Sequence, residues 1–324
     1  MRALLLIALA APAWAQTVAG ERVIGSEADI SALAFLADGA TLAGAGRDGN
    51  VRLWDARSGA LKRTIPLDKG DAAVTLVAAH DQLAAVGSDG SIKIWNLPSG
   101  ERAQKLAGFL PEAEGLAFFQ DRKLVAASSR VAPRSSAYTM LVWEGSGTQR
   151  FAVPAGLGGT AALAFSPGGG VLVASSYDTD IRAWNARNGE LLRLIDELTV
   201  ATFALAFSPD GGYLASAGVD RVVYLWDTKS WKLARKLAGQ PEMISAIAFS
   251  PDGRLLLTGG FSELTRSHPV SILLWDVAAG KVLGAFPAPH RVYSLAFSPD
   301  GKLAAYSAGQ KAVNVWPTAG LPRP

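Results

Sequence analysis

The sequence has no cysteine and only three histidines, His80, His268 and His290, in 324 residues. Without cysteine the chain forms no disulfide, thiolate zinc site or iron–sulfur cluster, and it has no thiol nucleophile or lipidated cysteine. The histidines lie far apart in the sequence, so a metal site or proton relay built from several of them is not expected. These absences exclude cysteine-dependent chemistry and argue against a histidine-rich metal centre.

A strong charge of one sign is also missing. The chain carries 31 Lys and Arg against 28 Asp and Glu, which gives a formal net charge of +3, and no run of five basic residues occurs. The two signs are mixed along the chain, so the sequence lacks the basic stripe that binds nucleic acid. With 49% hydrophobic residues, the chain has enough apolar side chains to build a core. We expect a globular protein with no nucleic-acid partner.

The first fifteen residues have the three parts of a secretory signal peptide. Arg2 gives the positive region, residues 4–11 the apolar region, and residues 13–15 an Ala-Trp-Ala cleavage box. The segment is too short to span a bilayer, and no later stretch has the roughly 18 uninterrupted apolar residues of a membrane helix. A buried N-terminal helix is the alternative. We expect cleavage after Ala15, a mature chain of residues 16–324, and a periplasmic or secreted bacterial protein.

The remainder of the chain repeats one pattern seven times. The first marker is a tryptophan, usually followed by a polar or acidic residue, at spacings of 41, 48, 41, 42, 49 and 41 residues. A second marker precedes each tryptophan and reads Phe-Ser-Pro-Asp-Gly at Phe207, Phe249 and Phe297. The seven tryptophans are Trp54, Trp95, Trp143, Trp184, Trp226, Trp275 and Trp316. Two markers in a fixed order indicate an internal structural repeat.

Each repeat is predicted to form four short strands. In the sixth repeat, residues 246–249 end at a Pro-Asp-Gly turn, residues 254–258 follow, a third strand ends in Trp-Asp, and residues 281–286 come after an Ala-Gly turn. Short runs broken by Gly, Pro, Asp and Asn are typical of strands and turns. Four strands in about 40–45 residues form one blade of a propeller. We therefore predict an all-β fold, a single seven-bladed β-propeller over residues 16–324.

These motifs resemble those of the WD40-repeat β-propellers. The resemblance rests on the seven tryptophan motifs and the Phe-Ser-Pro-Asp-Gly turns, and it extends over residues 17–324. It implies a ring that serves as a scaffold for protein partners, and because the chain shows no cofactor-binding motif we expect no cofactor. Together with the leader sequence, it indicates an exported bacterial member of the family.

The two ends of the chain contain complementary parts of one blade. The seventh repeat stops after its third strand, at residues 313–316, and residues 20–24 match the fourth strand of the first repeat at residues 59–65. We predict that the N-terminal strand completes the seventh blade. This pairing would close the ring and remove two exposed strand edges.

In the WD40 family a Gly-His, a Ser or Thr on the second strand, a turn Asp and the Trp form a hydrogen-bonded set. The resemblance assigns the hydroxyl to Ser216, Thr258 and Ser307. It assigns the turn carboxylate to Asp48, Asp89, Asp178 and Asp220, which, like the tryptophans, are predicted to be structural. No Gly-His occurs, so the buried indole N–H groups need other partners, because an unsatisfied one costs about 1–3 kcal/mol.

Two repeats are longer than the others. From the Phe marker, or the residue in its place, to the Trp, the third and sixth repeats span 25 and 26 residues against 18 or 19 elsewhere. The additions, within residues 130–138 and 261–269, replace the turn between the second and third strands. The resemblance places this turn on the face that also carries the connections between repeats, and such faces often bind partners.

Apolar, aromatic and arginine side chains are typical of protein interfaces. Several such side chains fall in the two insertions and the neighbouring connections. We predict that this face binds a protein partner of unknown identity, with the protein either monomeric or a subunit of a larger envelope or redox complex. The candidate partner-binding residues are Arg47, Phe109, Leu110, Arg134, Tyr138, Tyr177, Met243, Phe261, Arg266 and His268.

The alternative hypothesis is an enzyme or a small-ligand site at the mouth of the central channel, using the four turn aspartates. No G-x-S-x-G or H-E-x-x-H motif occurs. Residues 44–49 read G-x-G-x-x-G, but a strand is predicted to follow them where a dinucleotide site needs a helix. Asp178-Thr179-Asp180 lacks the further ligands of a calcium loop. We expect no catalytic, metal or cofactor residues, and aspartates that hold backbone turns would argue against the alternative.

Overall fold

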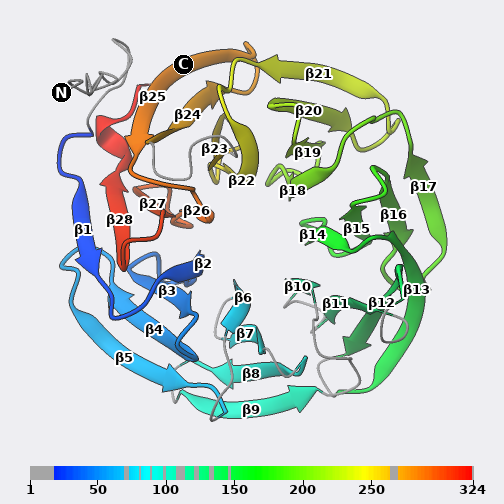
Figure 1. Ribbon diagram of the computed structural model, residues 1–324, viewed down its shortest axis with the longest axis horizontal. Helices are drawn as coiled ribbons and strands as arrows, with labels where there is room; N and C mark the ends of the chain where they lie inside the picture. Colours follow the sequence, from blue (N-terminus) through cyan, green and yellow to red (C-terminus); the bar gives the residue numbers. More distant parts are fainter. Residues whose placement is uncertain are drawn as a thin grey trace, which may run out of the picture.

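The computed structural model consists of seven four-stranded antiparallel sheets arranged around a central axis (Figure 1). The described residues are 18–68, 73–79, 82–87, 90–97, 100–106, 114–119, 124–130, 135–144, 147–262 and 269–322. They form 28 strands and one short 3-10 helix, Thr318–Gly320. The predicted all-β, seven-bladed propeller is confirmed.

Blade 1 comprises β2 (Ile30–Phe35), β3 (Thr41–Gly46), β4 (Asn50–Asp55) and β5 (Leu61–Pro66). Blade 2 comprises β6 (Ala73–Ala79), β7 (Gln82–Gly87), β8 (Ile92–Asn96) and β9 (Glu101–Leu106). Blade 3 comprises β10 (Glu114–Phe119), β11 (Leu124–Arg130), β12 (Ala137–Glu144) and β13 (Gln149–Leu157). Blade 4 comprises β14 (Thr160–Phe165), β15 (Val171–Ser176), β16 (Ile181–Asn185) and β17 (Leu191–Ile195). Blade 5 comprises β18 (Thr202–Phe207), β19 (Tyr213–Gly218), β20 (Val222–Asp227) and β21 (Leu233–Ala238). Blade 6 comprises β22 (Met243–Phe249), β23 (Leu255–Phe261), β24 (Val270–Asp276) and β25 (Lys281–Ala288). Blade 7 comprises β26 (Ser294–Phe297), β27 (Leu303–Ser307), β28 (Ala312–Pro317) and, from the N-terminal part of the chain, β1 (Arg22–Gly25).

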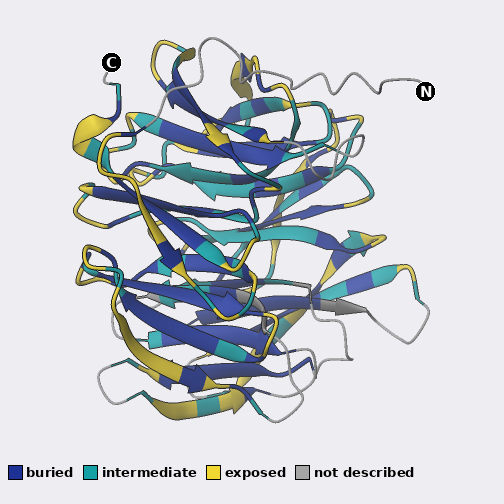
Figure 2. Ribbon diagram, turned by 60° about the vertical axis from the view of Figure 1, so that its left-hand side comes forward, coloured by how far each residue is buried: buried dark blue, intermediate teal, exposed yellow. Residues whose placement is uncertain are grey.

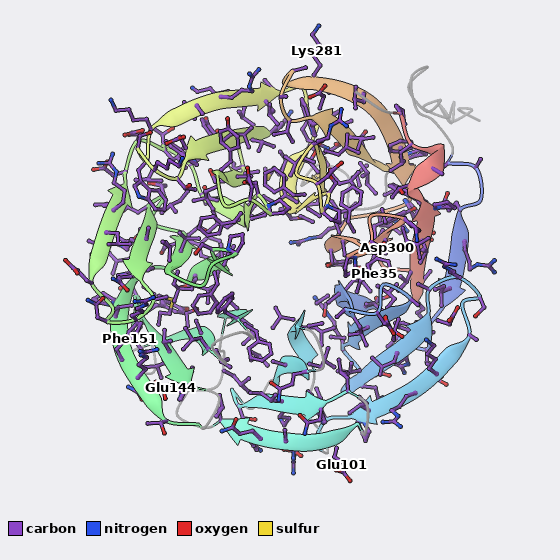
Figure 3. All side chains as sticks on the ribbon, turned by 180° about the vertical axis from the view of Figure 1, so that it is seen from behind. Phe35, Glu101, Glu144, Phe151, Lys281 and Asp300 are labelled. Carbon is purple, nitrogen blue, oxygen red and sulfur yellow. The ribbon has the colours of Figure 1, made fainter. Side chains whose placement is uncertain are left out.

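The first strand of each blade lies next to the axis and the fourth forms the outer rim (Figure 1). Burial is greatest in the middle of each blade. The second and third strands, such as β3 and β4, are almost wholly buried, whereas outer strands such as β5 and β17 are mostly exposed (Figure 2). In Figure 3, Glu101 and Lys281 lie at the outer rim, whereas Phe35 and Asp300 lie where blades 1 and 7 meet.

The Phe-Ser-Pro-Asp-Gly marker forms the turn between the first two strands of a blade. In blade 5, the Ser208 hydroxyl donates to the Asp210 carboxylate at 2.6 Å and accepts the Tyr213 N–H at 2.9 Å. Gly211 has φ +71°, in the left-handed region that favours glycine. The same serine bonds recur in blades 6 and 7. The hydrogen bond from Ser208 lowers the pKa of Asp210, which keeps the turn carboxylate ionised as an acceptor.

The apolar core is divided among the interfaces between blades. Each of the seven buried clusters found among the described residues joins two neighbouring blades. All seven motif tryptophans are buried, and each packs in the cluster that its blade shares with the preceding one. Trp95 of blade 2, for example, packs with Val51 and Leu53 of blade 1. In the part of the chain that the structure describes, no blade has a buried apolar cluster of its own, which explains why the repeat forms a closed ring.

The ring closes by pairing the two ends of the chain. Strand β1 runs antiparallel to β28, with Arg22 opposite Val315 and Gly25 opposite Ala312. The Ile24 side chain is 3% exposed and packs between blades 7 and 1, whereas that of Val23 is 64% exposed. The predicted completion of the seventh blade by the N-terminal strand is confirmed.

Two of the tryptophan N–H groups bond to hydroxyls at the expected positions. The indole of Trp226 donates to Ser216 Oγ at 2.9 Å, and that of Trp275 donates to Thr258 Oγ1 at 2.9 Å. Thr258 in turn donates to Gln240 Oε1 at 2.7 Å. Gln240, which follows Gly239, therefore takes the place that the family resemblance gives to histidine. The sequence signal was a Gly-Gln at the position of the missing Gly-His.

Blade 7 lacks this bond, and the predicted hydroxyl position is wrong there. Two residues after the strand partner of the motif tryptophan, blades 5 and 6 have Ser216 and Thr258, whereas blade 7 has Tyr306 rather than Ser307. Within the described part of the chain, the buried Trp316 N–H and the buried Ser307 hydroxyl have no hydrogen-bond partner. The Trp316 ring instead packs between the rings of Phe286 and Tyr306, at centroid distances of 5.1 and 5.0 Å. Tyr306 donates to Glu21 Oε1 at 3.2 Å. The closing blade is therefore fixed by aromatic packing and by a bond to the N-terminal segment.

The first prediction concerns the ring closure. Ile24→Ala removes a buried side chain at the seam and should lower the free energy of unfolding by about 2–5 kcal/mol. Val23→Ala, on the neighbouring exposed position of the same strand, should change it by less than about 0.5 kcal/mol. Thermal and denaturant unfolding followed by circular dichroism would measure both. Similar small effects of the two variants would mean that β1 does not support the ring.

The second prediction concerns the tryptophan bonds. Ser216→Ala leaves the Trp226 N–H buried without an acceptor and should cost about 1–3 kcal/mol of stability. Ser307→Ala removes a buried hydroxyl that makes no bond, and should be close to neutral or stabilising. The same unfolding measurements compare a serine that accepts a tryptophan N–H in blade 5 with a buried serine that makes no hydrogen bond in blade 7. A larger loss for Ser307→Ala would contradict the bonding described above.

Candidate functional site at the loop face

We call the loop face the side of the ring that carries the connections from second to third strands and from one blade to the next. Its longest second-to-third connections run from β11 to β12 and from β23 to β24, at residues 131–136 and 262–269. The strand ends therefore place both insertions at the expected turn. Blades 3 and 6, which carry these connections, lie across the ring from each other (Figure 1).

Bulges in the innermost strands set the direction of side chains at this mouth. The register between first and second strands shifts in blades 1 to 6, and in blade 5 the shift falls between Thr202 and Ala204. A bulge bends its strand and redirects a side chain. The residue at the bulge in blade 5 is Phe203. Tyr293 occupies the equivalent place in blade 7, because it follows a buried residue, Val292, just as Phe203 follows the buried Thr202.

At this level, aromatic rings from blades 4, 5 and 6 lie against one another, and an arginine links them to a ring of blade 7. The Phe203 ring centroid lies 6.0 Å from that of Tyr177 and 6.1 Å from that of Phe261. The Arg291 guanidinium lies 4.2 Å from the Phe261 centroid and 5.4 Å from that of Tyr293. We call Tyr177, Phe203, Phe261, Arg291 and Tyr293 the aromatic arc. Tilted ring pairs and a cation over a ring face are attractive contacts, so they hold these side chains in place.

The aromatic arc is partly open to solvent. Tyr177 is 49% exposed, Arg291 is exposed, and the three remaining rings are half-buried. Arg47, in the turn after β3, is also exposed. Loss of water around the Arg291 guanidinium and the positive charge of Arg47 both lower the pKa of Arg291, which remains charged because an arginine pKa lies far above neutrality. Among the described residues, no carboxylate lies within ion-pair distance of either arginine.

Four predicted partner-binding residues fall at this mouth or beside it. Tyr177 and Phe261 belong to the aromatic arc, and Met243 pairs with Phe261 across β22 and β23. The positive charge of Arg47 contributes to lowering the pKa of Arg291. Sequence reasoning missed Phe203, Arg291 and Tyr293. The sequence did carry a hint. Four residues before the Phe marker, blades 5 and 7 have an aromatic residue, Phe203 and Tyr293, where blades 1 and 6 have serine.

Tyr138 requires a correction. It was predicted to lie in an exposed loop, but β12 already begins at Ala137 and Tyr138 is only 3% exposed. Its ring packs in the cluster shared by blades 3 and 4, because the hairpin of β12 and β13 extends further than the other outer hairpins. The remaining candidates lie outside the described residues: Phe109, Leu110, Arg134, Arg266 and His268. The predicted leader, residues 1–15, and Asp89 lie outside them as well.

Three of the turn aspartates hold their own turns. Asp48 accepts from the Asn50 N–H at 3.3 Å and from Arg52 at 3.1 Å, and the bond from Arg52 is the main cause that lowers the pKa of Asp48 to about 2. Arg52 is itself buried. The turn geometry fixes this carboxylate through backbone and side-chain donors.

The other two aspartates follow the same pattern. Asp178 accepts from the Asp180 N–H at 3.3 Å and from Arg182 at 3.0 Å. Asp220 accepts from the Val222 N–H at 3.2 Å and from the Tyr224 hydroxyl at 2.7 Å. These bonds argue against the use of these carboxylates in channel chemistry. The recurring signal is a donor side chain four residues after the aspartate.

The remaining sequence motifs have structural explanations. Strand β4 begins directly after the G-x-G-x-x-G sequence, at Asn50, so no helix starts there. Asp180 bonds to Arg182 at 2.7 Å. Within the described ranges, no group of three His, Asp or Glu residues could hold a metal ion. None of the helices in the same ranges is long and apolar enough to cross a membrane.

Comparison with known proteins identifies the repeat. The family profile described as "WD domain, G-beta repeat" matches residues 21–55, 69–96, 158–185, 198–227, 231–263 and 280–317. These six segments cover more than half of the chain. The unmatched stretch includes blade 3, whose Trp143 is followed by Glu144 and which carries one of the insertions, yet this blade is complete in the structure. A search of curated proteins finds no match. The repeats and the seven-bladed ring together show that the chain belongs to the WD40-repeat family.

Proposed function

We propose that this protein is an exported, non-enzymatic interaction module that binds a protein partner on its loop face, at the aromatic arc. The WD40 β-propeller is typically a protein-interaction scaffold. The observation that carries the proposal is the cluster of three half-buried rings, the exposed Tyr177 and the exposed Arg291 at one edge of the channel mouth.

The composition of the aromatic arc suits an interface. Residues that contribute most to binding energy are enriched in Trp, Tyr and Arg and lie in clusters near the interface centre. The contacts within the aromatic arc hold its side chains in position before a partner arrives. This reduces the conformational entropy lost on binding. The blades beneath are rigid because each shares its core with two neighbours.

The insertion of blade 6 starts from the aromatic arc itself. Phe261 is the last residue of β23, and the connection to β24 continues from it. We include Arg266 and His268 of this connection, and Arg134 of the opposite one, in the proposed binding face. A partner seated at the channel mouth would then meet loops on two sides.

The third prediction tests the binding face. The double variant Tyr177→Ala/Phe261→Ala removes two rings of the aromatic arc and should abolish capture of the partner from an envelope extract, measured by quantitative mass spectrometry. A matched control is Leu191→Ala/Leu192→Ala, which truncates two exposed side chains (52% and 45%) on outer strand β17. The control should capture the same protein as the wild type, and both variants should melt close to the wild type. Unchanged capture by the Tyr177/Phe261 variant would overturn the proposal.

The fourth prediction tests export. In a bacterial host, the chain recovered from the periplasm or medium should begin at Gln16, as measured by intact mass. Replacing the small residues of the cleavage box, by Ala13→Leu with Ala15→Phe, should leave the leader attached because the signal peptidase requires small residues there. Ala11→Leu, outside the box, is the control and should be processed normally. Recovery of the full-length wild-type chain from the cytoplasm would contradict export.

A further inference from the structure

We propose that the aromatic arc and Arg47 recognise an acidic segment of the partner, in which a carboxylate side chain stands next to an aromatic side chain. The inference rests on the proposed function and specifies the chemistry of the partner. It commits to a peptide segment of a protein, held at the edge of the channel mouth formed by blades 4 to 7 and blade 1.

The first argument is the charge left over at this site. Burial is the main cause that lowers the pKa of Arg291, and repulsion by the like charge of Arg47 adds to it. No described carboxylate pairs with either arginine. A carboxylate between the two guanidinium groups would remove this repulsion. Arginine binds carboxylates with two parallel hydrogen bonds, which gives both strength and orientation.

The second argument is that the neighbouring acids are already engaged. Asp29 accepts the Lys311 backbone N–H at 2.9 Å. Asp178 is bonded to Arg182, and Asp220 to the hydroxyl of Tyr224. The described loop-face turns therefore offer free positive charge but little free negative charge beside the rings. A basic segment would face two arginines without a compensating carboxylate, which is unfavourable.

The third argument is the arrangement of the rings. Arg291 lies over Phe261 and near the Tyr293 ring, and Phe203 and Tyr177 extend the aromatic surface beyond Phe261. A ligand carboxylate bound at Arg291 would therefore have aromatic surface beside it. An aromatic side chain adjacent to that carboxylate would pack on Phe203 and Tyr177 in the tilted geometry that the rings already adopt with each other.

Nucleic acid also combines negative charge with stacking rings, but the chain disfavours it. The net charge is only +3 with 28 acidic residues. A phosphate backbone needs several basic contacts along its length. The two arginines at this site are enough to bind one or two carboxylates, but too few for a phosphate backbone.

The experiment is fluorescence anisotropy with short labelled peptides of equal length on the intact mature chain. One peptide contains Asp-Phe repeats, one Lys-Phe repeats and one Asp-Ala repeats, and a single-stranded oligonucleotide is added as a fourth probe. The Asp-Phe peptide should bind and the other three probes should bind about tenfold more weakly or not at all. Added salt should weaken the binding.

Three charge variants locate the site. Arg291→Glu and Arg47→Glu should each weaken binding of the Asp-Phe peptide about tenfold or more, and Arg47 touches no ring of the aromatic arc. The control Arg57→Glu makes the same charge change at an exposed residue between β4 and β5, on the opposite face, and should bind as the wild type does. Melting curves confirm that all three variants are folded.

The outcomes separate this inference from the proposed function. Equal or tighter binding of the Lys-Phe peptide or the oligonucleotide, no binding of any probe, or no effect of both arginine variants would overturn the acidic specificity. If the Tyr177/Phe261 variant nevertheless loses the captured partner, the loop face still binds a protein and only its chemistry is wrong. If that variant keeps the partner, the proposed function fails, whatever the peptides do.

Discussion

The structure depends on the fact that no blade can bury its own apolar faces. Every described core cluster lies between two blades, and each motif tryptophan packs in the cluster that its blade shares with the preceding one. A sheet of four short strands gains its stability only when both faces are covered. The ring must therefore close, and the pairing of β1 with β28 provides the last covered interface.

The candidate site inherits its geometry from this constraint. The aromatic arc takes side chains from four consecutive blades, and none of these side chains would meet its neighbours if the blades changed their relative rotation. Phe203 reaches Phe261 only because β18 and β22 lie side by side at the axis. Local bulges then turn the side chains toward the channel mouth. A rigid scaffold with small local irregularities is a common way to hold binding residues.

The sequence was sufficient to predict the features that repeat. The spacing of Trp54 and its six equivalents, together with the Pro-Asp-Gly turns, determines the blade count, and the truncated last repeat predicts the closing strand. It could not show which side chains meet across blades, since such contacts depend on register and on bulges. Phe203 and Arg291 were missed for this reason. Tyr138 was misplaced because its hairpin extends beyond the usual blade boundary. The Gly239-Gln240 pair was overlooked, and its role became clear from the bond that Gln240 accepts from Thr258.

The joining of β1 to β28 also constrains how the chain reaches its native state. Arg22 pairs with Val315, so β1 can pair only after β28, near the other end of the chain, has been synthesised. Contacts between such distant residues are slow to form because of the entropy lost in closing the intervening chain. Until then the open edges of β1 and β28 can pair with other chains. A chaperone that shields these edges during maturation would therefore raise the yield more than one that acts on any single blade.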